Sequence, residues 1–163
     1  MSLYSRRKLL MLAPLALGAC GFTPIFGRGT AAESLIGKIA LAPVDDRMGF
    51  EFYERLENRL GRADQPLYQL EVIISVNSEG LAITQDNAIT RYNLTAEANF
   101  SLTRIADNKL VLTDIVRSFT AYSATATAFA THVSERDANR RLAVALADQI
   151  ATRIAGSAKS FVQ

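Results

Sequence analysis

Residues 91–104 show the clearest alternation of apolar and polar side chains in this chain, and a period of two restricts the segment to a β-strand. The apolar set, which we expect to face a core, is Tyr92, Leu94, Ala96, Ala98, Phe100 and Leu102. The residues between them are polar, so the strand has one covered face and one face that is wet or meets a polar partner.

Neighbouring segments extend this strand into a sheet. Residues 106–109 predict a hairpin turn, and residues 110–122, rich in Val, Ile, Thr and Phe, predict an antiparallel returning strand. Residues 68–76 alternate in the same way, and residues 39–42 form a short apolar run. The stretch 79–90 fits either a loop or a partial strand. We therefore expect about four strands.

Helical spacing follows the first short strand. Tyr53, Leu56 and Leu60 recur at intervals of three and four, and Gly61 is placed to end that helix.

A second helix is predicted from Ser134, whose hydroxyl could cap it while Asp137 completes a capping box. Gly156 is expected to end this helix after about twenty residues. Its apolar stripe is Ala138, Leu142, Leu146, Ile150 and Ile154. The fold class that we predict is α+β, with two helices packed on one face of a roughly four-stranded mixed sheet.

Apart from Phe129, residues 122–131 are small or hydroxyl-bearing, and none of the ten carries a charge. Such a segment fits an extension of the preceding strand, a connection into the last helix, or a surface that contacts a partner.

The N-terminus has the three-part layout of an export signal: the basic residues 6–8, an apolar run over residues 9–17, and small residues before Cys20. The apolar run is too short for a membrane-spanning helix, which needs about 20 residues. Residues 5–10 also look like a twin-arginine signal, so either export route remains open.

Cys20 is the single cysteine of the chain, and residues 17–20, Leu-Gly-Ala-Cys, resemble a bacterial lipobox. That resemblance implies cleavage before Cys20 and lipid on its thiol and new N-terminus, which would hold the protein stably on a membrane. The alternative is a structural cysteine. The chain then divides into a signal peptide (1–19), a lipidated tether (20–37), one α+β domain (38–158) and a tail (159–163).

The signal peptide carries three cations and no carboxylate, so its removal leaves one more acidic than basic residue, 16 against 15. Binding of nucleic acid through bulk charge is therefore not expected.

Candidate catalytic groups are few. The chain has one histidine, His132, and the carboxylates of Asp45, Asp46 and Asp114 could in principle act as acid and base. Turn and capping roles suit these residues better. We expect neither a metal site nor a cofactor, and we predict that the protein is not an enzyme.

Several patches in order along the mature chain resemble the LptE family of lipopolysaccharide-assembly lipoproteins. The patches are residues 20–27, residues 46–49 leading to Leu56 and Leu60, residues 118–122 followed by Phe129 and Ala130, and residues 135–150.

The resemblance implies two helices on a four-stranded sheet and a non-catalytic role. It implies an outer-membrane lipoprotein that plugs the β-barrel lipopolysaccharide translocon, LptD, helps its assembly, and contacts lipopolysaccharide. Gly21 and Phe22 after the cysteine favour the outer membrane, because an aspartate there commonly marks inner-membrane retention. Cations on or beside the strands could meet lipopolysaccharide phosphates; the candidates are Arg91, Arg104, Lys109 and Arg117.

Two other functions stay open. An auxiliary lipoprotein of a periplasmic lipid-transporting ABC system would have inner-membrane partners. A tethered hydrolase would depend on His132 or Asp46.

Overall fold

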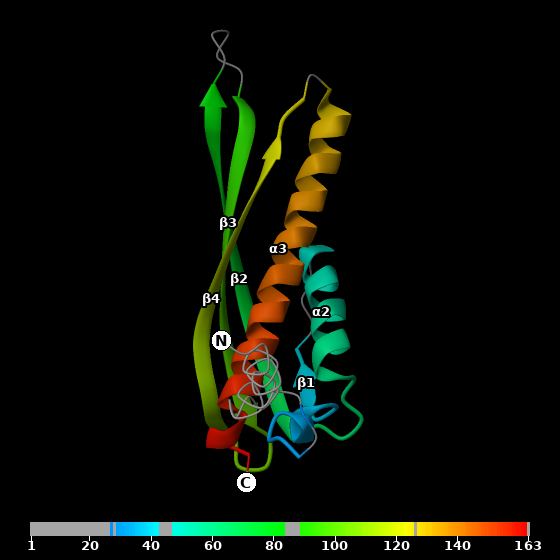
Figure 1. The fold of residues 1–163 in the computed structure, drawn as a ribbon, viewed down its shortest axis with the longest axis vertical. Helices are drawn as coiled ribbons and strands as arrows, with labels where there is room; N and C mark the ends of the chain where they lie inside the picture. The colour runs from blue at the N-terminus through cyan, green and yellow to red at the C-terminus, as the bar shows by residue number, and fades with distance from the viewer. Residues whose placement is uncertain (1–26, 28, 43–46, 84–88, 126, 163) are drawn as a thin grey trace, which may run out of the picture.

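The structure, a computed structural model, describes residue 27 and residues 29–42, 47–83, 89–125 and 127–162 (Figure 1). The elements are the 3-10 turn η1 (Glu33–Leu35), β1 (Ile39–Leu41), α2 (Arg47–Leu60), β2 (Tyr68–Ile83), β3 (Ile89–Arg104), β4 (Lys109–Ser123), α3 (Ala128–Ser157) and the 3-10 turn η2 (Ala158–Ser160).

One sheet runs in the order β1-β2-β3-β4. β1 is parallel to β2, with Ile39 opposite Tyr68, and the other neighbours are antiparallel. The sheet is therefore mixed and its inner face carries both helices, which confirms the predicted α+β fold (Figure 1).

The alternation of β3 is present as predicted. Leu94, Ala96, Ala98, Phe100 and Leu102 are buried, and the polar residues between them lie on the opposite, outer face. The outer face also carries apolar side chains, because the exposed Ile73 and Ile115 flank Asn99 there. Helices cover one side of the sheet only, so polar side chains are retained on the other.

The predicted stripe of the last helix, Ala138 to Ile154, is buried throughout. It packs against α2 and the inner face of the sheet. Between the helices, Asp148 accepts two hydrogen bonds from Arg55, with Nε to Oδ1 at 3.0 Å and Nη2 to Oδ2 at 2.9 Å. Arg59 approaches the same carboxylate at 3.5 Å.

Both predicted ends of this helix were wrong. α3 begins six residues earlier, after Thr127, whose hydroxyl accepts a hydrogen bond from the Ala130 backbone N–H. Ser134 instead donates to the Ala130 carbonyl at 3.0 Å, and Asp137 pairs with Arg141, so no capping box forms there. At the other end, Gly156 lies within the helix.

Gly61, in contrast, ends α2 as predicted. Its φ is +78°, and a Cβ there would lie 2.9 Å from the Gly37 nitrogen. Glycine is required because the backbone is left-handed and the chain entering β1 passes close by.

The structure assigns secondary structure to part of the two segments, 79–90 and 122–131, for which the sequence left alternatives open. Residues 79–83 continue β2 and residues 89–90 begin β3, while 84–88 lie outside the described residues. Of the stretch 122–131, the first two residues end β4 and the last four begin α3.

The core extends beyond the predicted limits of the domain, 38 and 158. Ala32 and Leu35, from the segment expected to be tether, are buried. Phe161, from the segment expected to be tail, is buried too, with its ring centroid 5.6 Å from that of Tyr68. Packed residues therefore run from at least 32 to 161.

Candidate functional site

α3 projects beyond the core at its N-terminal end. Its buried residues start at Ala138, and its first ten residues, 128–137, include none. α2 begins beside the following turns, so it covers only the lower part of α3 (Figure 1). The far ends of β2, β3 and β4 therefore face α3, with α2 reaching only the edge of this region at Met48. We call this region, α3 residues 128–141 with strand residues 76–81, 91–93 and 119–123, the open end.

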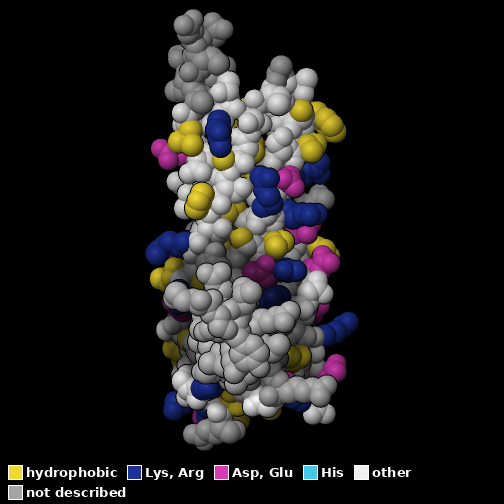
Figure 2. Space-filling model, in the orientation of Figure 1, with side chains coloured by type: hydrophobic (Ala, Val, Ile, Leu, Met, Phe, Trp, Pro, Cys, Tyr) yellow, Lys and Arg dark blue, Asp and Glu magenta, His cyan; other side chains and the backbone are white. Residues whose placement is uncertain are grey.

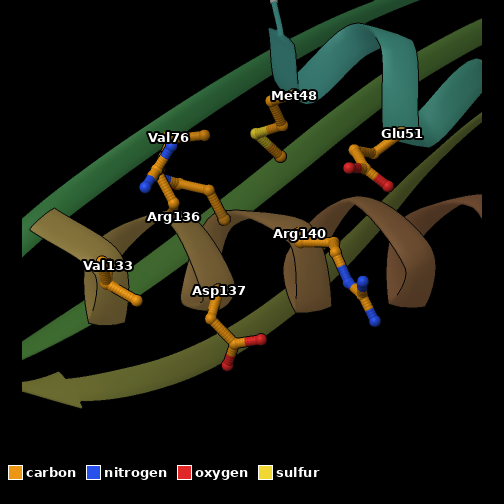
Figure 3. A pocket seen from close by; sticks show the side chains of 8 residues that line it. Met48, Glu51, Val76, Val133, Arg136, Asp137 and Arg140 are labelled. Carbon is orange, nitrogen blue, oxygen red and sulfur yellow. The ribbon is translucent and has the colours of Figure 1, made fainter.

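A cavity of about 530 Å³ lies between α3, the start of α2 and β2. Its apolar lining comes from three elements: Met48 of α2, Val76 of β2 and Val133 of α3. Figure 3 shows Arg136 extending from α3 toward Val76, whereas Arg140 points away from Val76 at the rim. The lining also includes the carboxylates of Glu51 and Asp137, so the cavity combines an apolar wall with charged groups of both signs.

A second cavity, of about 470 Å³, lies on the other side of the same helical turns, against β4. Val133 and Asp137 line both cavities. Its other lining is mainly polar and includes Arg91 and Arg141. Arg141 is engaged already, because it lies 3.1 Å from Asp137 and donates to the Ala121 carbonyl.

Tyr92 and Tyr122 stack across β3 and β4 in the open end, with ring centroids 5.1 Å apart and an interplanar angle of 15°. Partial burial raises the pKa of Tyr122, and the nearby Glu135 and Tyr92 raise it further, while a side-chain hydrogen bond with Ser78 acts in the opposite direction. The stack stabilises the pairing of β3 with β4 at the open end.

The four predicted lipopolysaccharide contacts do not converge. Arg91 is at the open end, whereas Arg104 and Lys109 lie opposite each other at the other end of the sheet. Arg104 is 3.4 Å from Asp107 and donates to the Phe161 carbonyl. Arg117 lies midway on the outer face, 2.7 Å from Glu97. Thus Arg91 alone of the four borders a described cavity of the open end.

Neither Arg136 nor Arg140 was among the residues that the sequence singled out as candidate site residues. The apolar partners, Met48 and Val76, come from segments distant in sequence. No local sequence pattern indicates that Met48 and Val76 lie beside these arginines.

The groups considered for catalysis lie apart. His132 is on the early turns of α3, 75% exposed and 3.5 Å from Glu135. Asp114 accepts from its neighbour Ile115 N–H and lies 3.6 Å from Arg153, far along the same helix. Asp45 and Asp46 fall outside the described residues, as does the proposed lipid-bearing Cys20.

In the described part of the chain, no group of three or more His, Cys, Asp or Glu side chains could hold a metal ion. The described helices also include none that is both long and apolar enough to span a membrane.

Solved structures share this fold. A structure named as a lipoprotein from Caulobacter crescentus CB15 is 20% identical, with a TM-score of 0.64 over 78% of this chain and 96% of that one. Rare lipoprotein B from Shewanella oneidensis is 14% identical, with a TM-score of 0.58 over 74% of this chain and 93% of that one. A minor lipoprotein from Acinetobacter baumannii is 17% identical, with a TM-score of 0.55 over 74% and 90%.

Sequence comparison agrees. An uncharacterised protein of Rickettsia prowazekii (strain Madrid E) is 22% identical over 145 residues, which are 89% of this chain and 92% of that protein. The sequence model of the LptE family, described as lipopolysaccharide-assembly, matches residues 36–154, most of the chain and nearly all of the packed domain. The chain therefore belongs to the LptE family, and its role is in lipopolysaccharide assembly.

Proposed function

We propose that this protein is an outer-membrane lipoprotein, anchored through lipid on Cys20 on the periplasmic side. There it occupies the lumen of the β-barrel lipopolysaccharide translocon, LptD, helps that barrel to assemble, and contacts lipopolysaccharide in transit. The observation that carries the proposal is the uncovered outer face of the sheet, found in a member of a lipopolysaccharide-assembly family.

The outer face suits a wet barrel wall. Along β3 it consists of the exposed Thr95 and the half-buried polar residues Asn93, Glu97, Asn99, Ser101 and Thr103. The interiors of membrane barrels are polar, so hydroxyl and amide groups there could exchange water for hydrogen bonds to the wall. Ile73 and Ile115, on either side of Asn99, add exposed apolar contacts within the same row.

The proposed role is binding rather than catalysis. His132 and the Asp114–Arg153 pair are separated along α3 by 21 residues, which correspond to about 30 Å of helix. A proton relay between the histidine and this carboxylate would need hydrogen-bond distance. Their separation fits surface roles for both.

The direct test is purification of the tagged full-length lipoprotein in a gentle detergent, with its partners identified by mass. We expect a large β-barrel protein in stoichiometric amount, and much less barrel with a Cys20→Ala variant expressed at the same level. ABC-transporter subunits in place of the barrel would contradict the proposal and favour an auxiliary lipoprotein of a lipid-transporting ABC system. Recovery of the lipoprotein without any partner would also count against it.

A further inference from the structure

The chain from Cys20 enters the fold at the end of the domain opposite the open end. Gly27 is held there, because its carbonyl accepts hydrogen bonds from the backbone N–H and the hydroxyl of Thr30, at 3.1 and 2.8 Å. Ala32 and Leu35, which follow, are buried. In Figure 1 this segment lies at the same end as β1, the turn between β3 and β4, and the end of α3. We call this region, residues 29–38, 61–67, 104–110 and 158–162, the anchor end.

Hydrogen bonds join the four segments of the anchor end. The Lys38 carbonyl accepts from the Leu67 N–H at 2.8 Å, and the Leu67 carbonyl accepts from the Ile105 N–H at 3.0 Å. Arg104 donates to the Phe161 carbonyl at 3.2 Å, which ties in the C-terminal segment. The side chains of these segments therefore form one continuous surface.

Large apolar side chains are exposed on this surface. They are Ile36, Leu67, Ile105 and Leu110, with exposed fractions of 48%, 55%, 47% and 55%. Apolar side chains gathered at the end of the domain nearest a lipid anchor fit contact with the boundary between lipid headgroups and acyl chains, where such groups leave water.

The anchor end is positively charged, although the mature chain has one more acidic than basic residue. Its cations are Lys38, Arg62, Arg104, Lys109 and Lys159, and its carboxylates are Glu33, Asp64 and Asp107. Arg104 pairs with Asp107 at 3.4 Å. Among the described residues, the structure records no ion pair for the other four cations. Figure 2 shows Lys and Arg side chains beside hydrophobic ones at the lower end of the molecule. Such a surface is complementary to an anionic membrane.

The short connection to Cys20 keeps the anchor end close to the membrane. Between Cys20 and Gly27 the chain advances seven residues, and an extended chain spans at most about 3.6 Å per residue, so Gly27 stays within about 25 Å of the lipid. A tether of this length raises the effective concentration of the domain at the surface. A contact that would be weak for a free protein is therefore occupied.

We propose that the anchor end rests on the anionic phospholipid surface that holds the lipid of Cys20. Leu67, Ile105 and Leu110 enter the headgroup region, and the four cations without an ion pair contact lipid phosphates. The open end is thereby directed away from this surface. This inference rests on the proposed function, since it requires the anchor on Cys20.

The test places single tryptophans in a chain that has none. The mature lipoprotein with Leu67→Trp or Leu110→Trp is reconstituted into vesicles of phosphatidylethanolamine and phosphatidylglycerol with brominated acyl chains. The matched control is Phe129→Trp, at a position of the open end that is 78% exposed. We expect emission at shorter wavelength and severalfold stronger quenching from the two reporters at the anchor end than from the control.

A second set of variants tests the role of charge. Lys109→Ala/Lys159→Ala in the Leu67→Trp protein should lower the quenching at least about twofold, because attraction to anionic headgroups is lost. The matched control, Arg117→Ala/Arg153→Ala, removes two exposed arginines outside the anchor end and should leave the quenching as it was.

Three results would overturn the inference. Equal quenching of Phe129→Trp would show that the domain lies flat on the membrane, and unquenched reporters at the anchor end would show that this end stays in water. Quenching that Lys109→Ala/Lys159→Ala does not change would exclude the contact with phosphates. Flotation of the vesicles is scored on the same samples. Protein that does not float contradicts the anchor on Cys20 and this inference with it, whereas protein that floats with unquenched reporters overturns this inference alone.

Discussion

Tyr122 stacks on Tyr92 on the inner face of the sheet at the open end, and its ionisation would introduce charge into this partly buried pair. Because the pKa of Tyr122 is raised in the folded protein, the unfolded chain loses this proton first as the pH rises. The contribution to stability is therefore complete below the ordinary tyrosine pKa of about 10 and is lost as the pH rises toward the higher folded value.

We predict that stability between pH 8 and pH 11 falls more steeply in the unchanged protein than in a Tyr122→Phe variant. Urea unfolding at a series of pH values measures the difference, which should appear only above about pH 9. If stability falls in parallel for the two proteins over the whole pH range, the pKa of Tyr122 is not raised by folding, which contradicts the prediction.

Leu146 is fully buried at the centre of the α3 stripe, whereas Phe129 on the same helix is 78% exposed. Leu146→Asp should lower the free energy of unfolding by several kcal/mol, because an unpaired carboxylate would be taken out of water. Phe129→Asp should change it by no more than about 0.5 kcal/mol. Thermal melting compares the two. A normal melting curve for Leu146→Asp would mean that the core face is misassigned.

The helices and strands with a strong apolar periodicity were predictable from the sequence, whereas the residues at which they begin and end were not. The β3 alternation and the α3 stripe follow directly from one-sided burial. The start of α3 was missed because Thr127 and Ser134 both carry hydroxyls, and only the fold shows that the former caps while the latter bonds back to Ala130. The six residues between them include two alanines and no glycine or proline, so they are compatible with either start.

The two glycines at expected helix ends behave oppositely. Gly61 has a positive φ and no room for a Cβ, whereas Gly156 is helical with nothing within 4 Å of an added Cβ. Gly61→Ala should therefore lower the free energy of unfolding by about 1 kcal/mol or more. Gly156→Ala should raise it by about 0.5–1 kcal/mol. Chemical denaturation measures both, and a loss of stability in Gly156→Ala would contradict the helical placement.

The domain as a body is long and narrow, with both helices and the long strands running in roughly the same direction (Figure 1). β3 has 16 residues, which correspond to about 50 Å. A transmembrane barrel has an apolar band about 25 Å tall, so a plug of this length could contact both the wall and the mouth of a barrel. The shape and the site at the open end depend on long-range packing, and no local sequence pattern could have predicted them.

The packed residues begin no later than Ala32, and Cys20 lies outside the described residues. We therefore predict that Cys20→Ala leaves the fold unchanged while the precursor stays uncleaved or is displaced from the membrane. Fractionation with mass measurement detects the second effect, and melting in detergent checks the first. A large drop in melting temperature would refute the separation of anchor and fold.

A domain enclosed in a barrel lumen contacts the barrel through both its sheet and its helical layer, whereas a domain docked against one side contacts it through one layer only. Photo-crosslinking side chains placed in living cells at Ile73 and Phe119, on the outer face of the sheet, and at Phe50, on the helical layer, test this difference directly. These three residues are 71%, 79% and 67% exposed, so each replacement should leave the core intact. The account predicts adducts with the same barrel protein from all three positions. Adducts from one layer only, or from none, would contradict the plug.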